Sequence, residues 1–137
     1  MSETFTLRIP GETQRRLNER ATGVDTPPRT LAQRYLEEGL RMDECPGIFF
    51  ADGPAGRRAR LFGTGADVWE VIATVKDNDG DEKAASDYLD LPVSMVRSAV
   101  AYYAAFPDEI DALIERNRAE NERAQAAWLA AREALKS

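Results

Sequence analysis

Phe5-Thr6-Leu7-Arg8-Ile9-Pro10 is the stretch that decides the fold of this chain. Apolar and polar side chains alternate along it, and a period of two places them on opposite faces of a strand. The apolar set is Phe5, Leu7 and Ile9, and the polar set is Thr4, Thr6 and Arg8. A lone strand of this length is not stable, and no neighbouring segment has the pattern of a partner. The sequence therefore predicts pairing with the same strand of a second copy.

Two helices are predicted directly after this strand. Pro10 ends the strand because it has no N–H to donate, and the pattern of residues 11–21 is helical. Residues 23–28 form a turn in which Thr26 is the predicted N-cap and Pro27 the first helical residue. The second helix is expected to run to about Arg41. Its apolar positions are Leu31, Ala32, Tyr35, Leu36 and Leu40.

Strand, helix, turn and helix within about forty residues resemble the ribbon-helix-helix (CopG/Arc/MetJ-like) DNA-binding proteins, including VapB-type antitoxins. The resemblance includes the Phe-x-Leu-Arg-x-Pro run and implies a homodimer whose two-stranded ribbon enters the DNA major groove. It implies that Thr4, Thr6 and Arg8 reach base edges. It also implies that Arg29, Thr30 and the free amides opening the second helix hold a phosphate. Taken singly, each residue fits an ordinary solvated strand–helix–helix unit.

Composition narrows the classes of protein that remain. The chain has 137 residues with 43% hydrophobic and 31% charged residues, which is typical of an ordinary soluble protein. No apolar run has the length of a membrane span, and the first residues do not have the pattern expected of a signal peptide. One cysteine, Cys45, allows no internal disulfide, so we expect a cytoplasmic location. Histidine is absent, which removes the usual general base and the commonest metal ligand. We expect neither an enzyme nor a cofactor.

The net charge of −6 is unevenly distributed. Residues 1–43 are neutral, with seven basic and seven acidic side chains. Residues 44–107 carry −4 and residues 108–137 carry −2. The predicted DNA-binding part thus has no acidic excess, and the acidic surplus downstream favours a basic partner such as a nuclease.

A second module is predicted over residues 45–107. Residues 48–50 and 58–61 have the pattern of short strands around a turn-rich segment, 51–56, and so predict a hairpin. Thr64 with Asp67 resembles a capping box at the start of the next helix. The polar loop 77–80 has oxygen ligands, but Ser86 stands where an EF-hand needs glutamate.

The rest of this module has the spacing of a helix-turn-helix. A short helix is predicted from Asp81 to Tyr88, and a longer one from Pro92 to about Phe106. The predicted apolar stripe is Leu91, Val96, Val100 and Tyr103. A second DNA contact would then use Ser94, Arg97 and Ser98. The alternative, a three-helix packing unit that never touches DNA, remains open.

Residues 47–114 resemble a domain of unassigned function with a predicted helix-turn-helix, found in bacterial antitoxins paired with PIN-type nucleases. Four stretches carry the likeness: Asp52-Gly53-Pro54, Gly63-Thr64, Val68-Trp69 and Ala101-Tyr102-Tyr103-Ala104-Ala105-Phe106-Pro107-Asp108-Glu109-Ile110-Asp111. Gly65 departs from the basic residue that many members have after Gly-Thr.

One long helix is predicted for residues 108–137. Its acidic first turn suits the helix dipole. Its apolar stripe begins at Ile110, Leu113 and Ile114, which we expect to pack onto the preceding domain. The outer part is the predicted toxin-binding surface, with Asn117, Asn121, Ala124, Trp128 and Leu135. A dimeric coiled coil or a frayed tail is the alternative.

The sequence as a whole predicts a mainly α protein in three parts. Residues 1–44 form the ribbon-helix-helix module, 45–107 the hairpin and helix-turn-helix domain, and 108–137 the C-terminal helix. The resemblances imply the antitoxin of a type II toxin–antitoxin system, which represses transcription at its own operator and neutralises a PIN-type ribonuclease. The alternative is a stand-alone ribbon-helix-helix regulator whose C-terminal domain senses a ligand or oligomerises.

Overall fold

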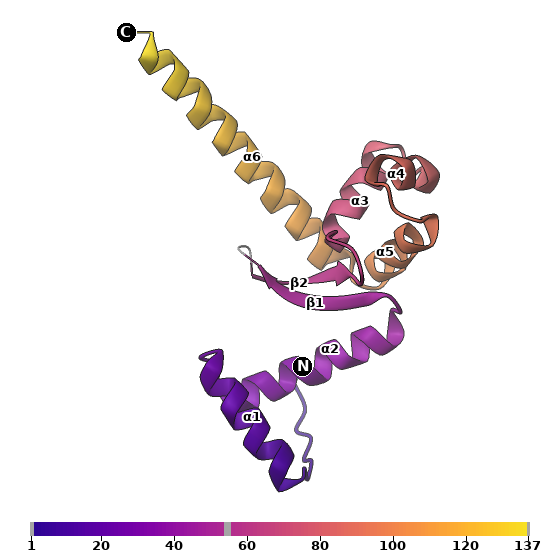
Figure 1. The fold of residues 1–137 in the computed structure, drawn as a ribbon, viewed down its shortest axis with the longest axis vertical. Coiled ribbons are helices and arrows are strands. Elements are labelled where there is room, and N and C mark those ends of the chain that lie inside the picture. Colours follow the sequence, from indigo (N-terminus) through magenta and orange to yellow (C-terminus); the bar gives the residue numbers. More distant parts are fainter. Residues whose placement is uncertain (1, 54–55, 137) are drawn as a thin grey trace. The chain divides into compact units, whose positions relative to one another are not determined.

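The computed structural model describes residues 2–53 and 56–136, which are mainly helical and contain one small antiparallel sheet. The chain divides into two compact units, Met1–Arg41 and Met42–Ser137. Among the described residues the elements are α1 (Gly11–Gly23), α2 (Pro28–Glu44), β1 (Ile48–Gly53), β2 (Gly56–Leu61), α3 (Val68–Asp77), α4 (Glu82–Leu89), α5 (Val93–Ala105) and α6 (Pro107–Leu135) (Figure 1).

The first unit contains the two predicted helices with small changes at their ends. α1 ends at Gly23, two residues beyond the predicted end, and α2 continues to Glu44. The prediction of Pro27 as the first helical residue is wrong by one position, because α2 begins at Pro28. The Thr26 hydroxyl donates to the Val24 carbonyl at 3.1 Å. This side chain therefore stabilises the turn between the helices.

The expected N-terminal strand is not present in the single chain. Residues 2–10 have no regular secondary structure, and the first strand of the described residues begins at Ile48. A strand is defined by its hydrogen-bonded neighbour, and the single chain offers residues 4–9 no neighbour. The ribbon-helix-helix arrangement is therefore not confirmed.

The predicted hairpin is confirmed and is longer than expected. β1 and β2 pair in antiparallel register from Ile48 opposite Leu61 to Gly53 opposite Gly56. Residues 54 and 55 of the predicted turn lie outside the described residues. Ile48 and Leu61 are buried, which fixes the face of the sheet that packs on the helices.

The cap of α3 differs from the expected one. Asp67 is the N-cap, and its backbone amide donates to Oε1 of Glu70 at 3.3 Å as part of a capping box. The Thr64 hydroxyl instead donates to the Leu61 carbonyl at 3.0 Å and accepts from the Ala66 amide at 3.0 Å. The sequence pattern placed the box one turn too early because Thr64 stabilises the preceding loop.

α4 and α5 have the expected spacing of a short helix, a tight turn and a longer helix. Asp81 caps α4 by accepting from the Ala84 amide at 3.1 Å. Asp90 ends α4 in the left-handed conformation, with φ of 56°. An aspartate tolerates this conformation better than most residues. The turn thereby redirects the chain into α5.

The core of the second unit lies between the hairpin and the helices. Its buried residues are Cys45, Ile48, Ala59, Leu61, Val68, Val71, Ile72, Val75, Ala85, Val96, Ala99, Tyr102 and Ile110. Tyr102 is fully buried, whereas Tyr103, the tyrosine of the predicted stripe, is only half-buried. The Tyr102 hydroxyl donates to Oε2 of Glu109 at 2.6 Å. This contact satisfies its polar end, which is why a tyrosine can occupy the core.

None of the helices in the described parts of the chain is long and apolar enough to cross a membrane.

Candidate DNA interface and partner-binding helix

The predicted base-reading residues lie on an exposed N-terminal segment. Thr4, Thr6 and Arg8 are all exposed. The apolar residues between them are exposed as well, with Phe5 at 77% and Leu7 at 67%. Folding of a single chain thus buries neither face of the predicted strand.

The rest of the first unit also leaves large apolar side chains exposed. Among the described residues of this unit, Ala21 and Leu31 are the only buried apolar ones. Tyr35, Leu36 and Leu40 of α2 are all exposed. Two buried apolar residues make a very small core for two helices, so this unit needs further apolar contacts to be stable.

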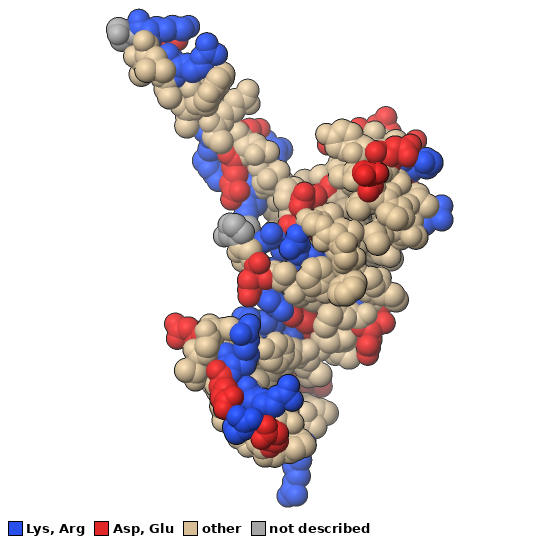
Figure 2. All heavy atoms as spheres, viewed as in Figure 1, with Lys and Arg blue, Asp and Glu red and all other residues tan. Residues whose placement is uncertain are grey.

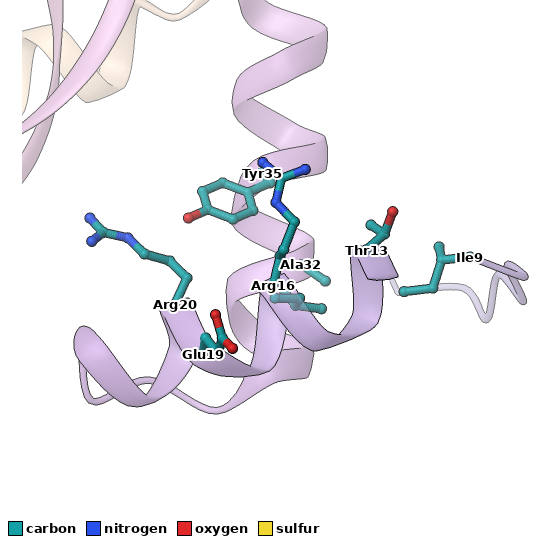
Figure 3. Close-up of a pocket in the computed structure, with 8 residues that line it drawn as sticks. Ile9, Thr13, Arg16, Glu19, Arg20, Ala32 and Tyr35 are labelled. Carbon is teal, nitrogen blue, oxygen red and sulfur yellow. The ribbon is translucent and has the colours of Figure 1, made fainter. Parts of the chain in front are cut away.

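An open groove runs between α1 and α2 (Figure 3). Its volume is about 810 Å³. The lining residues are Ile9, Thr13, Arg16, Leu17, Glu19, Arg20, Ala32 and Tyr35. The groove joins the apolar end of the N-terminal segment to the exposed face of α2. Its lining combines apolar side chains with the charged side chains of Arg16, Glu19 and Arg20.

The beginning of α2 combines several features that suit an anion. Arg29 and Thr30 are exposed in the first turn, and this turn contains no acidic side chain. The first amides of a helix lack intrahelical acceptors, and the dipole there favours negative charge. The structure thus leaves both residues accessible to a phosphate.

The second predicted DNA-binding face, on α5, is partly occupied by contacts within the domain. Nε of Arg97 donates to Oε2 of Glu82 at 3.1 Å, which ties α5 to the start of α4. The Ser98 hydroxyl donates to the Ser94 carbonyl at 3.1 Å, within the same helix. These residues lie together on one side of α5, but their arrangement is equally suited to a helix-packing role.

A buried charged cluster on the hairpin was not predicted. The Asp67 carboxylate accepts from Nε of Arg58 and, at 3.1 Å, from Nε1 of Trp69, while Nε of Arg60 lies 2.8 Å away. The Asp67 side chain is only 4% exposed. Arg60 also donates to the Gly65 carbonyl at 2.7 Å. Arg58 and Arg60 are two residues apart on β2 and so lie on one face of the strand. This spacing is visible in the sequence and could have predicted a shared acidic partner.

We expect this cluster to hold the hairpin to α3. Asp67→Ala should lower the free energy of unfolding of the second unit by about 3 kcal/mol, because it leaves two largely buried arginines without their carboxylate. Asp52→Ala is the matched control. Asp52 is 68% exposed and lies 3.4 Å from Arg57, so its loss should cost about 0.5 kcal/mol or less. Urea unfolding followed by circular dichroism measures both, and equal losses would contradict the structural role.

The base of α6 is attached to the rest of its unit. Ile110 is fully buried, and Leu113 and Ile114 pack on the same core, as predicted. Oδ1 of Asp111 accepts from the Tyr103 hydroxyl at 2.8 Å and from Nζ of Lys76 at 3.0 Å. These two contacts, the tyrosine first, lower the pKa of Asp111. Three helices therefore meet at this carboxylate.

The outer half of α6 leaves the domain (Figure 1). Asn117 is half-buried, and every residue from 121 to 136 is exposed. Trp128, at 55% exposure, and Leu135 are thus available to a partner, with Asn121 and Ala124 on the same stripe. The Arg132 guanidinium lies 4.9 Å from the centre of the Trp128 ring.

The described residues contain no group of three or more potential metal ligands, including the loop after α3. The predicted site residues lie on two exposed surfaces: the N-terminal segment with the start of α2, and the outer half of α6. In comparisons with protein-family models, curated proteins and solved structures, no match to this chain was found.

Proposed function

We propose that this protein is the antitoxin of a type II toxin–antitoxin pair. Two copies join through residues 4–9 into a ribbon that binds operator DNA and represses transcription. The outer half of α6 binds and neutralises a toxin, which the resemblance to antitoxin-associated domains makes a PIN-type ribonuclease. The observation that carries the proposal is the exposed apolar surface of the first unit, formed by Phe5, Leu7, Ile9, Tyr35, Leu36 and Leu40.

Pairing with a second copy would cover the part of this surface that lies on residues 4–9. Strand pairing satisfies the backbone groups of residues 4–9, and it brings six apolar side chains of the two strands together on one face. The same pairing puts Thr4, Thr6 and Arg8 of both copies on the opposite face. A two-stranded ribbon has the width of the DNA major groove.

The helical part of the dimer supplies the phosphate contacts. Arg29 and Thr30 are exposed at the start of α2, where the amides and the dipole favour an anion. Phosphate contacts of this kind position a protein on DNA, and contacts to base edges select the sequence. The proposed roles of Arg8 and Arg29 are therefore different and can be separated by experiment.

Arg8→Ala should weaken binding to the DNA upstream of the protein's own gene by roughly 1–3 kcal/mol and relax discrimination at one base pair. Arg29→Ala should weaken binding to that DNA and to random DNA equally. Fluorescence anisotropy titrations of both variants on both duplexes measure the difference. If Arg8→Ala loses the same affinity on the two duplexes, or Arg29→Ala loses affinity on only one of them, the assigned roles are wrong.

The toxin-binding part is tested by expressing the product of the adjacent reading frame with and without this chain. The proposal expects growth arrest that this chain relieves, and a complex that survives purification. A harmless neighbour together with retained operator binding would instead support the stand-alone regulator.

A further inference from the structure

The charges of α6 are divided between its two halves. Residues 107–120 contain five acidic and two basic side chains, whereas residues 121–136 contain two acidic and three basic ones. The acidic excess therefore lies in the half that docks on the protein's own core. The exposed half has a net charge of +1, opposite in sign to the whole chain.

The local contacts increase this difference. Arg118 forms ion pairs with Glu115 and Glu122, which places the acidic charge at the start of the exposed half in an internal pair. Near the end, Nζ of Lys136 lies 3.7 Å from Oε2 of Glu133. Arg132 instead lies over the indole of Trp128. The charged group beside Trp128, the largest apolar side chain of the exposed half, is thus the cation of Arg132.

The face around Trp128 is otherwise small and uncharged. Residues three, four and seven positions apart share a helix face. This face consists of Asn121, Ala124, Trp128, Ala131 and Leu135. Figure 2 shows a largely uncharged surface along the outer half of α6, with basic side chains at its end. Alanines allow close approach of a partner's backbone, so the only deep pocket needed is one for the indole.

We propose that the partner surface for α6 is a narrow apolar groove whose rim carries carboxylates, with a pocket for Trp128 and an acid facing Arg132. The inference rests on the proposed function, in which this helix captures a protein partner. Burying the arginine beside the indole without an opposite charge would be costly. Tryptophan and arginine are also the residue types that most often dominate interfaces.

The partner's expected charge is opposite to the one that the net charge of the chain alone would favour. The acidic surplus of the C-terminal half favoured a basic partner. The exposed half is, however, about 24 Å long at 1.5 Å per residue, and the Debye length at physiological salt is about 8 Å. Its own charges therefore outweigh those of the distant domain at the point of contact.

Charge reversal at two neighbouring positions tests the inference. The probe is the purified product of the adjacent reading frame, bound to the full-length chain in biolayer interferometry at low and physiological salt. Arg132→Glu should lower the affinity at least about tenfold and slow association. Glu133→Lys, which changes a charge away from the Trp128 face, should leave the affinity equal or raise it.

The outcomes that contradict the acidic groove differ from those that contradict toxin capture. An affinity that rises with Arg132→Glu, or falls with Glu133→Lys, overturns the acidic groove and leaves toxin capture standing. Absence of any complex with the wild-type chain overturns the proposed function and this inference together. The groove is equally wrong if Trp128→Ala changes the protein's own oligomeric state in sedimentation equilibrium, or if Arg132→Glu weakens operator binding.

Discussion

Replacing Leu7 with aspartate is expected to abolish the homodimer and, with it, specific DNA binding. In the proposed ribbon each dimer would bury two aspartates in the centre of its apolar face. Burying an unpaired carboxylate costs several kcal/mol, so two should weaken the dimer by more than about a thousandfold. Sedimentation equilibrium of the full-length variant at micromolar concentration measures the effect. The first unit should also lose helical signal, because Ala21 and Leu31 are its only buried apolar residues among those described.

Thr4→Asp is the matched control for this experiment. It introduces the same charge three residues earlier, on the opposite face of the strand, so the dimer should persist while binding to DNA weakens. A wild-type chain that stays monomeric at micromolar concentration contradicts the ribbon. A dimeric Leu7→Asp variant would show that the chain dimerises through another surface.

Truncation after Ile114 is expected to abolish toxin neutralisation while operator binding is retained. The removed residues include the whole exposed half of α6, whereas Ile110, Leu113 and Ile114 stay in the core. The second unit should therefore remain folded. Survival of cells that co-express the neighbouring gene product measures neutralisation, and a gel-shift assay with upstream DNA measures operator binding. Continued protection by the truncated chain would exclude α6 as the capture element.

Trp128→Ala narrows the same test to one side chain. A large aromatic anchor in a partner's pocket contributes roughly 2–4 kcal/mol to binding. Leu129→Ala is the matched control, because Leu129 is exposed to nearly the same extent, at 53%, but lies on another face of the helix. We expect a large loss of affinity for the first variant and a small one for the second. Equal losses would mean that the stripe does not define the contact.

Local patterns were sufficient to predict most of the elements. The hairpin, α3, the short helix and turn before α5, and the long α6 all follow from periodicity and from turn residues, which act over a few neighbouring positions. The exposure of Trp128 also agrees with its predicted availability. Most predicted helix ends differ from the observed ones by one or two residues. At helix ends a capping side chain can form alternative local hydrogen bonds, and the sequence does not show which one forms.

Contacts between distant residues were decided only by the tertiary structure. The pattern of α5 placed Tyr103 in its stripe, but the packing of Phe50 and Phe106 around Tyr102 put the neighbouring tyrosine at the centre. The Asp67 cluster depends on the way the chain turns back after β2, which pairs Asp67 with Arg60 in an isolated β-bridge and so brings both arginines to one carboxylate.

The N-terminal segment shows the opposite case, in which the sequence has a clear pattern and the structure of the single chain has no corresponding element. Its alternating pattern is plain in the sequence, yet the single folded chain contains no strand there, because the hydrogen-bonding groups that would complete it belong to another molecule in the proposed dimer. The sequence by itself determined which residues form helices, which form the hairpin, and which faces are apolar. The tertiary structure decided which apolar faces are buried within the single chain. Burial depends on packing between residues that are distant in the sequence, and local periodicity carries no information about that packing.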